Sequence, residues 1–226
     1  MTHKSSISPS KDTPTKAASL GEHVYLEVLK AIREGKYHPG ERIRESEITQ
    51  ELNVSRTPVR EAFRRLQSEG RLTIEPQRGA VVTELNHQEV AELYELRQQL
   101  ESIAAQFAAK SASDAEISTM EYLLKRAEES ADDHRALNQI NWELHHTIYQ
   151  SAHNRFLMKV YNSLSDSMAL LRGSKYIPEG RPETLHKEHK KIVDAIKKRD
   201  PEGAATAAKE HIQRSFELHL ETKLNL

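Results

Sequence analysis

Four residues in the second half of the chain have types and spacings that could bind a divalent metal ion. Asn141 and His145 are four residues apart, so their side chains share one face of a helix. His189 lies 11 residues before Asp200, where a proline follows, and His211 lies 11 residues after it. In an antiparallel helix pair both would lie roughly 16 Å from the turn and face each other. Three imidazoles and an amide oxygen suit a zinc, nickel or cobalt ion. The alternative is three unrelated histidines at the edge of the core, each with a hydrogen-bond partner, and spacing alone leaves both interpretations open.

A second group of residues has the chemistry to bind a polyanion. Arg56, Arg60 and Arg64 recur every four residues on one helical face, where like charges repel one another. A nucleic acid would remove that repulsion, whereas the simpler alternative is a solvated basic face. Arg65 belongs to the simpler class, because Glu61 lies four residues before it and can pair with it. The opposite, apolar face of the same helix consists of Val59, Ala62, Phe63 and Leu66.

The elements around this basic helix favour DNA binding. Residues 44–52 form a short amphipathic helix, and Asn53 supplies a turn residue that tolerates left-handed geometry. Pro58 fits the first turn of the basic helix, with Thr57 or Ser55 as its cap. Helix, tight turn and basic helix form the arrangement that reads the major groove.

A β-hairpin is expected directly after the basic helix. Residues 72–75 and 80–83 are short β-type runs, and residues 76–79 join them in a turn that carries Arg78. A helix-turn-helix followed by such a hairpin is a winged helix.

Three segments of this region resemble the winged-helix domain of the GntR family of transcriptional regulators. They are Tyr37–Ile43, Val54–Ala62 and Gly70–Gly79, and the resemblance covers roughly residues 21–85. It implies that the basic helix reads operator DNA in the major groove while the wing enters the adjacent minor groove. The implied DNA-binding residues are Arg44, Ser55, Arg56, Thr57, Arg60, Arg64, Arg78 and Gly79.

Composition indicates a helix-rich soluble protein. The 226 residues are 37% hydrophobic and 30% charged, with a net charge of −1, so positive charge matters by position and not in total. No stretch approaches the roughly 18–20 apolar residues of a membrane-spanning helix, and the N-terminus has no apolar signal region. We therefore expect a cytoplasmic protein that does not contact membranes. The chain has no cysteine, which excludes disulfides and thiolate metal sites.

The expected fold class is mainly α, in three parts. Residues 1–19 form a disordered tail, residues 20–85 the winged helix-turn-helix with its small hairpin, and residues 86–226 an all-α bundle. Helical periodicity and breaks at Ser, Asp, Asn, Gly and Pro predict the bundle helices at about 88–110, 114–131, 134–152, 154–173, 183–199 and 201–222.

The bundle resembles the FCD effector domain of the FadR subfamily of GntR regulators. The motif that carries the resemblance consists of Asn141, Leu144, His145, Glu188, His189, Ile192, Ala195, Ile196, Asp200, Ala204 and His211. Such domains commonly bind a divalent metal through one acidic residue and three histidines. The resemblance therefore implies Asn141, His145, His189 and His211 as ligands, with zinc or nickel as the expected ion. Position 141 is usually Asp, and the neutral carbonyl of Asn is a weaker ligand.

Two arginines complete the expected pocket. Arg97 interrupts an apolar stripe, and a buried guanidinium needs an anionic partner, for which Glu101 four residues on is the simple candidate. Arg172 ends a helix in which Leu164, Met168 and Leu171 look buried, and it could simply cap that end. The resemblance implies that Arg97 and Arg172 hold a small carboxylate effector, and bidentate Arg–carboxylate contacts give this preference a physical basis.

The favoured function is a metabolite-responsive regulator, most often a repressor, that binds a palindromic operator as a homodimer. One alternative is a metal-responsive or ligand-independent regulator with a structural metal. A less favoured one is a metal-dependent hydrolase, which needs a general base beside the metal. Glu143, Glu188 and Glu210 adjoin the ligands in sequence but are about 100° around the helix from them, which counts against catalysis.

Overall fold

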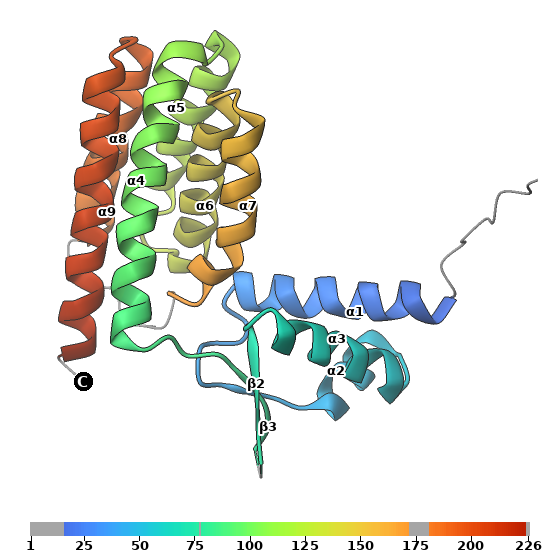
Figure 1. Ribbon diagram of the computed structural model, residues 1–226. Coiled ribbons are helices and arrows are strands. Elements are labelled where there is room, and N and C mark those ends of the chain that lie inside the picture. Colours follow the sequence, from blue (N-terminus) through green and yellow to red (C-terminus); the bar gives the residue numbers. More distant parts are fainter. Residues whose placement is uncertain (1–15, 77, 172–180, 225–226) are drawn as a thin grey trace, which may run out of the picture. The chain divides into compact units, whose positions relative to one another are not determined.

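The computed structural model describes residues 16–76, 78–171 and 181–224. The chain divides into two compact units, residues 1–83 and residues 84–226 (Figure 1). Within the described residues no helix is long and apolar enough to cross a membrane. Arg172, one of the two expected effector-binding arginines, lies outside the described residues.

The first unit is a winged helix with three helices and a small sheet. Its elements in chain order are α1 (Lys16–Arg33), β1 (Arg42–Ile43), α2 (Glu45–Leu52), α3 (Arg56–Ser68), β2 (Leu72–Glu75) and β3 (Gly79–Val82). The sheet is antiparallel in the order β1-β3-β2. The predicted hairpin is thus present, but β1 was not predicted, because its two residues are too few to show a periodicity. Helix α1 begins four residues before the expected Leu20.

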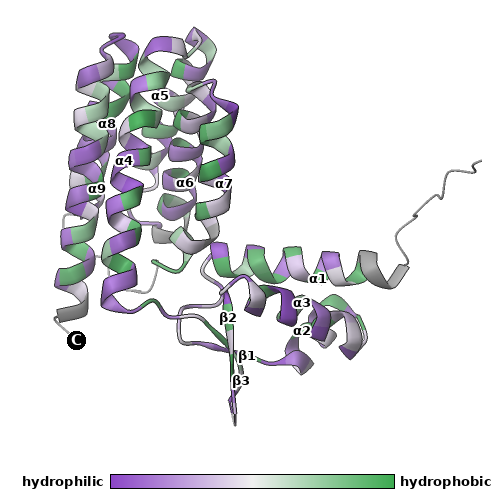
Figure 2. Cartoon of the chain, in the orientation of Figure 1, coloured by the Kyte–Doolittle hydropathy of each residue, from purple (hydrophilic) through white to green (hydrophobic). Residues whose placement is uncertain are grey.

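The core of this unit fixes the direction of α3. Val59, Phe63 and Leu66 are buried on one face of α3, and this helix packs against α1, where Val24 and Val28 are also buried. Because the apolar face is anchored, the strongly hydrophilic opposite face is turned to solvent (Figure 2). The tight turn before α3 uses Asn53 with φ of 50° and ψ of 47°, as the sequence predicts.

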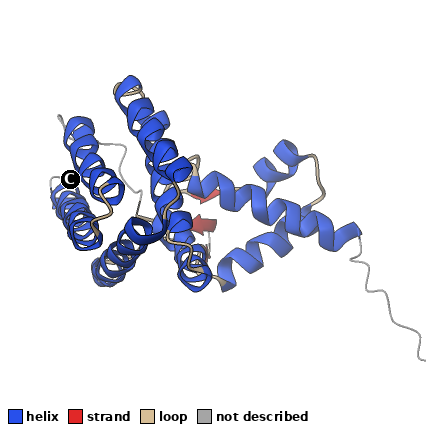
Figure 3. Ribbon diagram, turned by 90° about the horizontal axis from the view of Figure 1, so that it is seen from above, coloured by secondary structure: helices blue, strands red, loops and turns tan. Residues whose placement is uncertain are grey.

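The second unit is an all-helical bundle in the described residues. Its helices are α4 (His87–Ser111), α5 (Asp114–Glu129), α6 (His134–Ser151), α7 (Arg155–Ala169), α8 (Arg181–Lys197) and α9 (Pro201–Leu224). Figure 3 shows helices throughout this unit, with the strands confined to the first. Full capping boxes, in which the cap side chain and the third-residue glutamate exchange hydrogen bonds with backbone N–H groups, fix the starts of α4 at Asn86 and α5 at Ser113.

Small residues let the long helices of the bundle approach one another. On α4, Ala104, Ala105 and Ala108 are fully buried, and α4 packs extensively against α9, where Ala204 and Ala208 are buried. Ile192, Val193 and Ile196 of α8 fill the same core. This close packing of α4, α6, α8 and α9 sets the distances between the polar groups that these four helices direct into the interior.

Candidate DNA-reading face and metal centre

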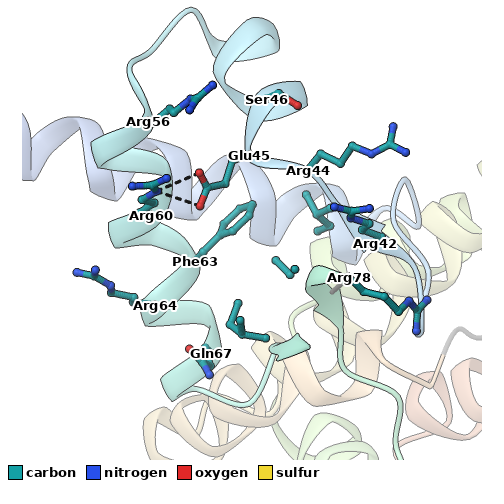
Figure 4. Close-up of a pocket in the computed structure, with 14 residues that line it drawn as sticks. Arg42, Arg44, Glu45, Ser46, Arg56, Arg60, Phe63, Arg64, Gln67 and Arg78 are labelled. Atoms are coloured by element: carbon teal, nitrogen blue, oxygen red, sulfur yellow. Dashed lines mark hydrogen bonds and ion pairs between the residues drawn. The ribbon is translucent and has the colours of Figure 1, made fainter. Parts of the chain in front are cut away.

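The exposed face of α3 borders a basic hollow in the first unit. The hollow has a volume of about 720 Å³ and is lined by six arginines: Arg42, Arg44, Arg56, Arg60, Arg64 and Arg78. Figure 4 shows Arg56, Arg60 and Arg64 projecting from α3 on one side and Arg42, Arg44 and Arg78 on the other. A concave surface lined by guanidinium groups suits the phosphates and base edges of duplex DNA.

The remaining expected DNA contacts also lie at this hollow or beside it. Ser55 is the N-cap residue of α3, and Thr57 is exposed in its first turn. Gly79 lines the hollow with φ of 80°, a left-handed conformation that disfavours a side chain. Arg42 was not among the expected DNA contacts, although Arg42 and Arg44 are two residues apart in extended backbone and therefore point to the same side.

Ion pairs hold several of these arginines when DNA is absent. The Arg60 Nε donates to both carboxylate oxygens of Glu45, at 3.1 and 3.0 Å, so a carboxylate compensates the charge of Arg60 when DNA is absent (Figure 4). Arg78 contacts Glu75 at 3.1 Å. Arg56 and Arg64 make no ion pair in the described part of the chain, which leaves two guanidinium groups of the α3 row uncompensated.

The expected pairing of Arg65 with Glu61 is also wrong. Arg65 instead pairs with Glu22 and with Glu69, and its guanidinium lies 3.7 Å from the centre of the Tyr25 ring. The anchored α1 presents Glu22 and Tyr25 to the same side of α3, and an aromatic face adds cation–π attraction that a single carboxylate lacks. Arg65 therefore joins α1 to α3, a structural role.

In the second unit, His145, His189 and His211 converge. One nitrogen from each lies within 4.8 Å of the others, and all three side chains are buried. The ring centres of His189 and His211 are 4.7 Å apart, and those of His145 and His189 are 5.4 Å apart. The two histidines on either side of Asp200 are therefore level across the α8–α9 pair, as the spacing predicts.

Two of the three histidines each contact a carboxylate through Nδ1, on the side of the ring opposite Nε2. The Nδ1 atom of His145 lies 2.8 Å from Glu101, and the Nδ1 atom of His211 lies 2.7 Å from Glu188. Each carboxylate also contacts an arginine: Arg97 Nε lies 3.4 Å from Glu101, and Arg181 lies 2.7 Å from Glu188. Two series of contacts, Arg97–Glu101–His145 and Arg181–Glu188–His211, therefore end at the cluster.

These carboxylates select which ring nitrogen faces the cluster. A carboxylate accepts the proton at Nδ1, so Nε2 of His145 and of His211 keeps its lone pair. The Nε2 atoms of His145 and His189 are buried and have no hydrogen-bond partner in the part of the chain that the structure describes. A buried imidazole nitrogen without a partner costs free energy unless a metal or water fills the space, so the donor set fits a borderline divalent cation.

The electrostatics of the cluster agree with this assignment. Burial lowers the pKa of both His189 and His211 well below 6.5, and the neighbouring histidines lower it further, so both rings are neutral near pH 7. Burial alone would raise the pKa of Glu101, but the hydrogen bond and charge of His145 together with the charge of Arg97 lower it to about 2. Neutral His189 and His211 rings and an ionised Glu101 suit the ligation of a metal ion.

Comparison with known families places both units. The first unit matches the gntR family of bacterial regulatory proteins over residues 20–82, and the second matches the FCD domain over residues 92–214. The chain belongs to the GntR family.

Relatives of this GntR protein extend over most of its length. It is 32% identical to the Nta operon transcriptional regulator of Aminobacter aminovorans over 82% of this chain and 87% of that one. It is 28% identical to the transcriptional repressor RspR of Escherichia coli over 79% of each chain. The E. coli protein McbR/YncC has the same fold, with a TM-score of 0.79 over 90% of this chain and 98% of that one, at 21% identity.

Within the FCD domain, the other expected site residues have different surroundings. Asn141 is half-buried one turn before His145 on α6, and its role as fourth ligand stays a prediction. Arg97 is only 16% exposed at its side chain and contacts Glu101, the partner that sequence reasoning named as the simple alternative. Two neighbouring histidines have other contacts: His146 stacks on Trp142 with ring centres 4.9 Å apart, and His186 contacts Glu128 at 3.0 Å.

Glu188 lies at the histidine cluster, contrary to the expectation from sequence. Its position next to His189 suggested that it points away from the cluster, but its side chain reaches across to His211 on α9. The helical angle between neighbours was correct, and it excluded contact only with the histidine on the same helix. No pattern within α8 alone could reveal a partner 23 residues away on the next helix.

We expect Glu188→Gln to weaken metal binding about 10–100-fold, because an amide no longer fixes the His211 ring with Nε2 facing the cluster. Competition between the purified full-length protein and a zinc chelator would measure the change. Glu210→Gln is the matched control, since Glu210 is an exposed neighbour of His211 on the same helix. A purely structural role would lower the melting temperature of the metal-free protein and leave its zinc affinity unchanged.

Proposed function

We propose that this GntR-family regulator is a cytoplasmic repressor that binds a palindromic operator as a homodimer and is controlled by a small carboxylate. The carboxylate binds beside a divalent metal, zinc or nickel, held by His145, His189 and His211, with Asn141 as the fourth protein ligand. The observation that carries the proposal is the pair of unpartnered Nε2 atoms, on His145 and His189, in a buried cluster that carboxylates orient from behind.

The four proposed protein ligands leave the charge of the metal ion uncompensated. Four neutral protein ligands compensate none of the cation's charge, so an anion is the natural additional ligand. When bound, the metal supplies a positive charge and an open coordination position for a carboxylate oxygen. Arg97 contacts the cluster through Glu101 and is the expected arginine, of the two, that lies within the described residues and could hold the carboxylate directly, while Arg172 remains a proposed second contact. The Arg97–Glu101 contact of 3.4 Å is long, so the guanidinium is only loosely held by its present partner.

Ligand binding could alter operator affinity by changing the packing of the helices that carry the histidines. The three rings come from α6, α8 and α9, so an acid bound among them changes the free energy of a particular packing of these helices. If that packing also sets the spacing of the two DNA-reading heads in a dimer, the acid alters operator affinity.

Titration of the metal-loaded protein with a panel of small organic acids tests the proposal. We expect one acid to change operator affinity by about 5–150-fold, and operator DNA to change the affinity for the acid by the same factor. Arg97→Ala and the charge-conserving Arg97→Lys should both weaken acid binding, whereas Arg155→Ala, an exposed arginine at the start of α7, should not. Calorimetry on each variant gives the affinities.

Two results would contradict the proposal. Equal acid affinity in the wild type and both Arg97 variants would place the acid elsewhere. If no acid in the panel binds the metal-loaded wild type, the site is a structural metal centre or the regulator responds to the metal itself. The ion pair between Arg97 and Glu101 favours this alternative, a regulator with a structural metal or one that responds to the metal, because Arg97 already has an anionic partner.

A further inference from the structure

Two exposed, uncharged side chains line the basic hollow of the first unit together with its six arginines. They are Gln67, near the end of α3, and Ile74, on β2. Phosphates and guanines explain the arginines, because a guanidinium pairs with an anion and with the two acceptors of a guanine edge. An aliphatic side chain can make neither contact, and an amide brings no charge to a phosphate. These two residues therefore indicate that the hollow meets a further kind of chemical group.

Ile74 is exposed where the core of the first unit ends. Leu72 and Ile74 lie on the same face of β2, because side chains alternate along a strand. Leu72 is buried, whereas 49% of Ile74 is exposed. Ile74 is paired with Ala80 on β3, and Ala80 and Phe63 are buried residues that also line the hollow. The hollow thus has an apolar floor, from which Ile74 extends into solvent.

The location of this isoleucine matters more than its exposure. Single exposed apolar side chains are common on protein surfaces. A surface lined with arginines for a polyanion, however, gains little from an apolar side chain unless the nucleic acid presents an apolar group in return. In the major groove, that group is the C5-methyl of thymine. Contact with Ile74 would remove the methyl group and the exposed part of the isoleucine from water, which is favourable.

Gln67 extends the row of arginines on α3. It lies three residues after Arg64 and seven after Arg60, so it shares their solvent-facing side, as Figure 4 shows. Its side-chain amide has no hydrogen-bond partner in the described part of the chain. An amide presents a donor beside an acceptor, which matches the N7 acceptor and N6 donor of adenine. It does not match the two acceptors of guanine, to which arginine is suited.

We propose that Gln67 and Ile74 read an A·T base pair in the major groove, Gln67 through the N6 and N7 atoms of adenine and Ile74 through the methyl group of thymine. This inference rests on the proposed binding of an operator at the hollow and adds two specificity-determining residues. Seven residues of helix separate Gln67 from Arg60, about 10 Å along the axis, and successive base pairs are about 3.4 Å apart. With α3 along the groove, the A·T pair should lie about three base pairs from a guanine that Arg60 reads.

Base analogues that lack single groups test both contacts. The full-length protein first selects an operator from random duplexes, and deoxyuridine, which lacks only the methyl group, then replaces each thymine in turn. We expect one replacement in each half-site to weaken binding about fourfold, because the contact of one methyl group is lost. At the adenine of the same pair, 7-deazaadenine lacks the N7 acceptor and should weaken binding about fivefold or more. Fluorescence anisotropy measures each affinity.

Variants assign each effect to its residue. Ile74→Ser should be insensitive to the deoxyuridine replacement that weakens the wild type, and Gln67→Ala should be insensitive to 7-deazaadenine at the paired position. Because each comparison is made between two duplexes on one variant, a change in folding affects both affinities equally. Leu26→Ala should respond to both analogues as the wild type does, since Leu26 is 51% exposed on α1 and does not line the hollow.

Two results would overturn the inference. If no deoxyuridine replacement weakens binding by the wild type, the protein does not read a thymine methyl group. If Ile74→Ser or Gln67→Ala keeps the wild-type sensitivity to its analogue, another residue makes that contact. Both results would leave operator binding at the hollow intact. The proposed operator binding fails separately, if the wild-type protein selects no sequence from the random duplexes.

Discussion

Adding zinc to the metal-free protein should raise the melting temperature of the helical bundle by about 5–10 °C. A ligand that binds only the folded state stabilises it by about 2.7 kcal/mol at a concentration of 100 times its Kd, and each kcal/mol raises the melting temperature of a domain of this size by about 2–4 °C. The Nε2 atoms of His145 and His189 gain a partner on metal binding, which removes the cost of leaving them buried and unsatisfied. Differential scanning calorimetry with and without metal measures the shift.

Variants of the ligands make this result specific. His189→Gln keeps much of the side-chain volume in the core and should abolish the shift, because the cluster loses one of its three imidazoles. Asn141→Asp should enlarge the shift if residue 141 is the fourth ligand, since an anionic oxygen binds a dication more tightly than a neutral one. His87→Ala removes an exposed histidine at the start of α4 and serves as the control. The metal assignment fails if elemental analysis of protein prepared without chelator finds no divalent ion and zinc and nickel both leave the melting temperature unchanged.

The level positions of His189 and His211 could be predicted because they depend on one helix pair and one turn. A break at Asp200 and an equal number of residues on each side determine the level of both side chains. The wing was predictable for the same reason: β2 and β3 are joined by a short turn, and their register follows from it. In both cases the information is local in sequence.

Partners from distant elements could not be predicted in this way. Glu101 and His145 are 44 residues apart, and their contact depends on how α4 packs against α6. Arg65 shows the same limit, because helical spacing favoured Glu61 while the packing of α1 supplied Glu22 and Tyr25. Charged side chains are long and choose among several partners, so sequence spacing identifies candidates and tertiary packing selects one.

Arg60→Ala should lower the affinity for a cognate operator by about 1–3 kcal/mol if this guanidinium reads a guanine edge. The structure adds a second source of loss, because the variant leaves Glu45 unpaired in a hollow that must receive phosphates. The double variant Arg60→Ala/Glu45→Gln removes that carboxylate charge, so a double-mutant cycle separates the two contributions.

We expect the double variant to regain part of the non-specific affinity and none of the discrimination between the cognate operator and one changed at a single guanine. Fluorescence anisotropy on an operator selected from random duplexes measures both quantities, with Arg155→Ala as the control. Undiminished discrimination in Arg60→Ala would mean that Arg60 contacts only phosphates or Glu45, and base reading would then fall to Arg56 and Arg64, the two arginines of α3 that the structure leaves without an ion pair in its described part.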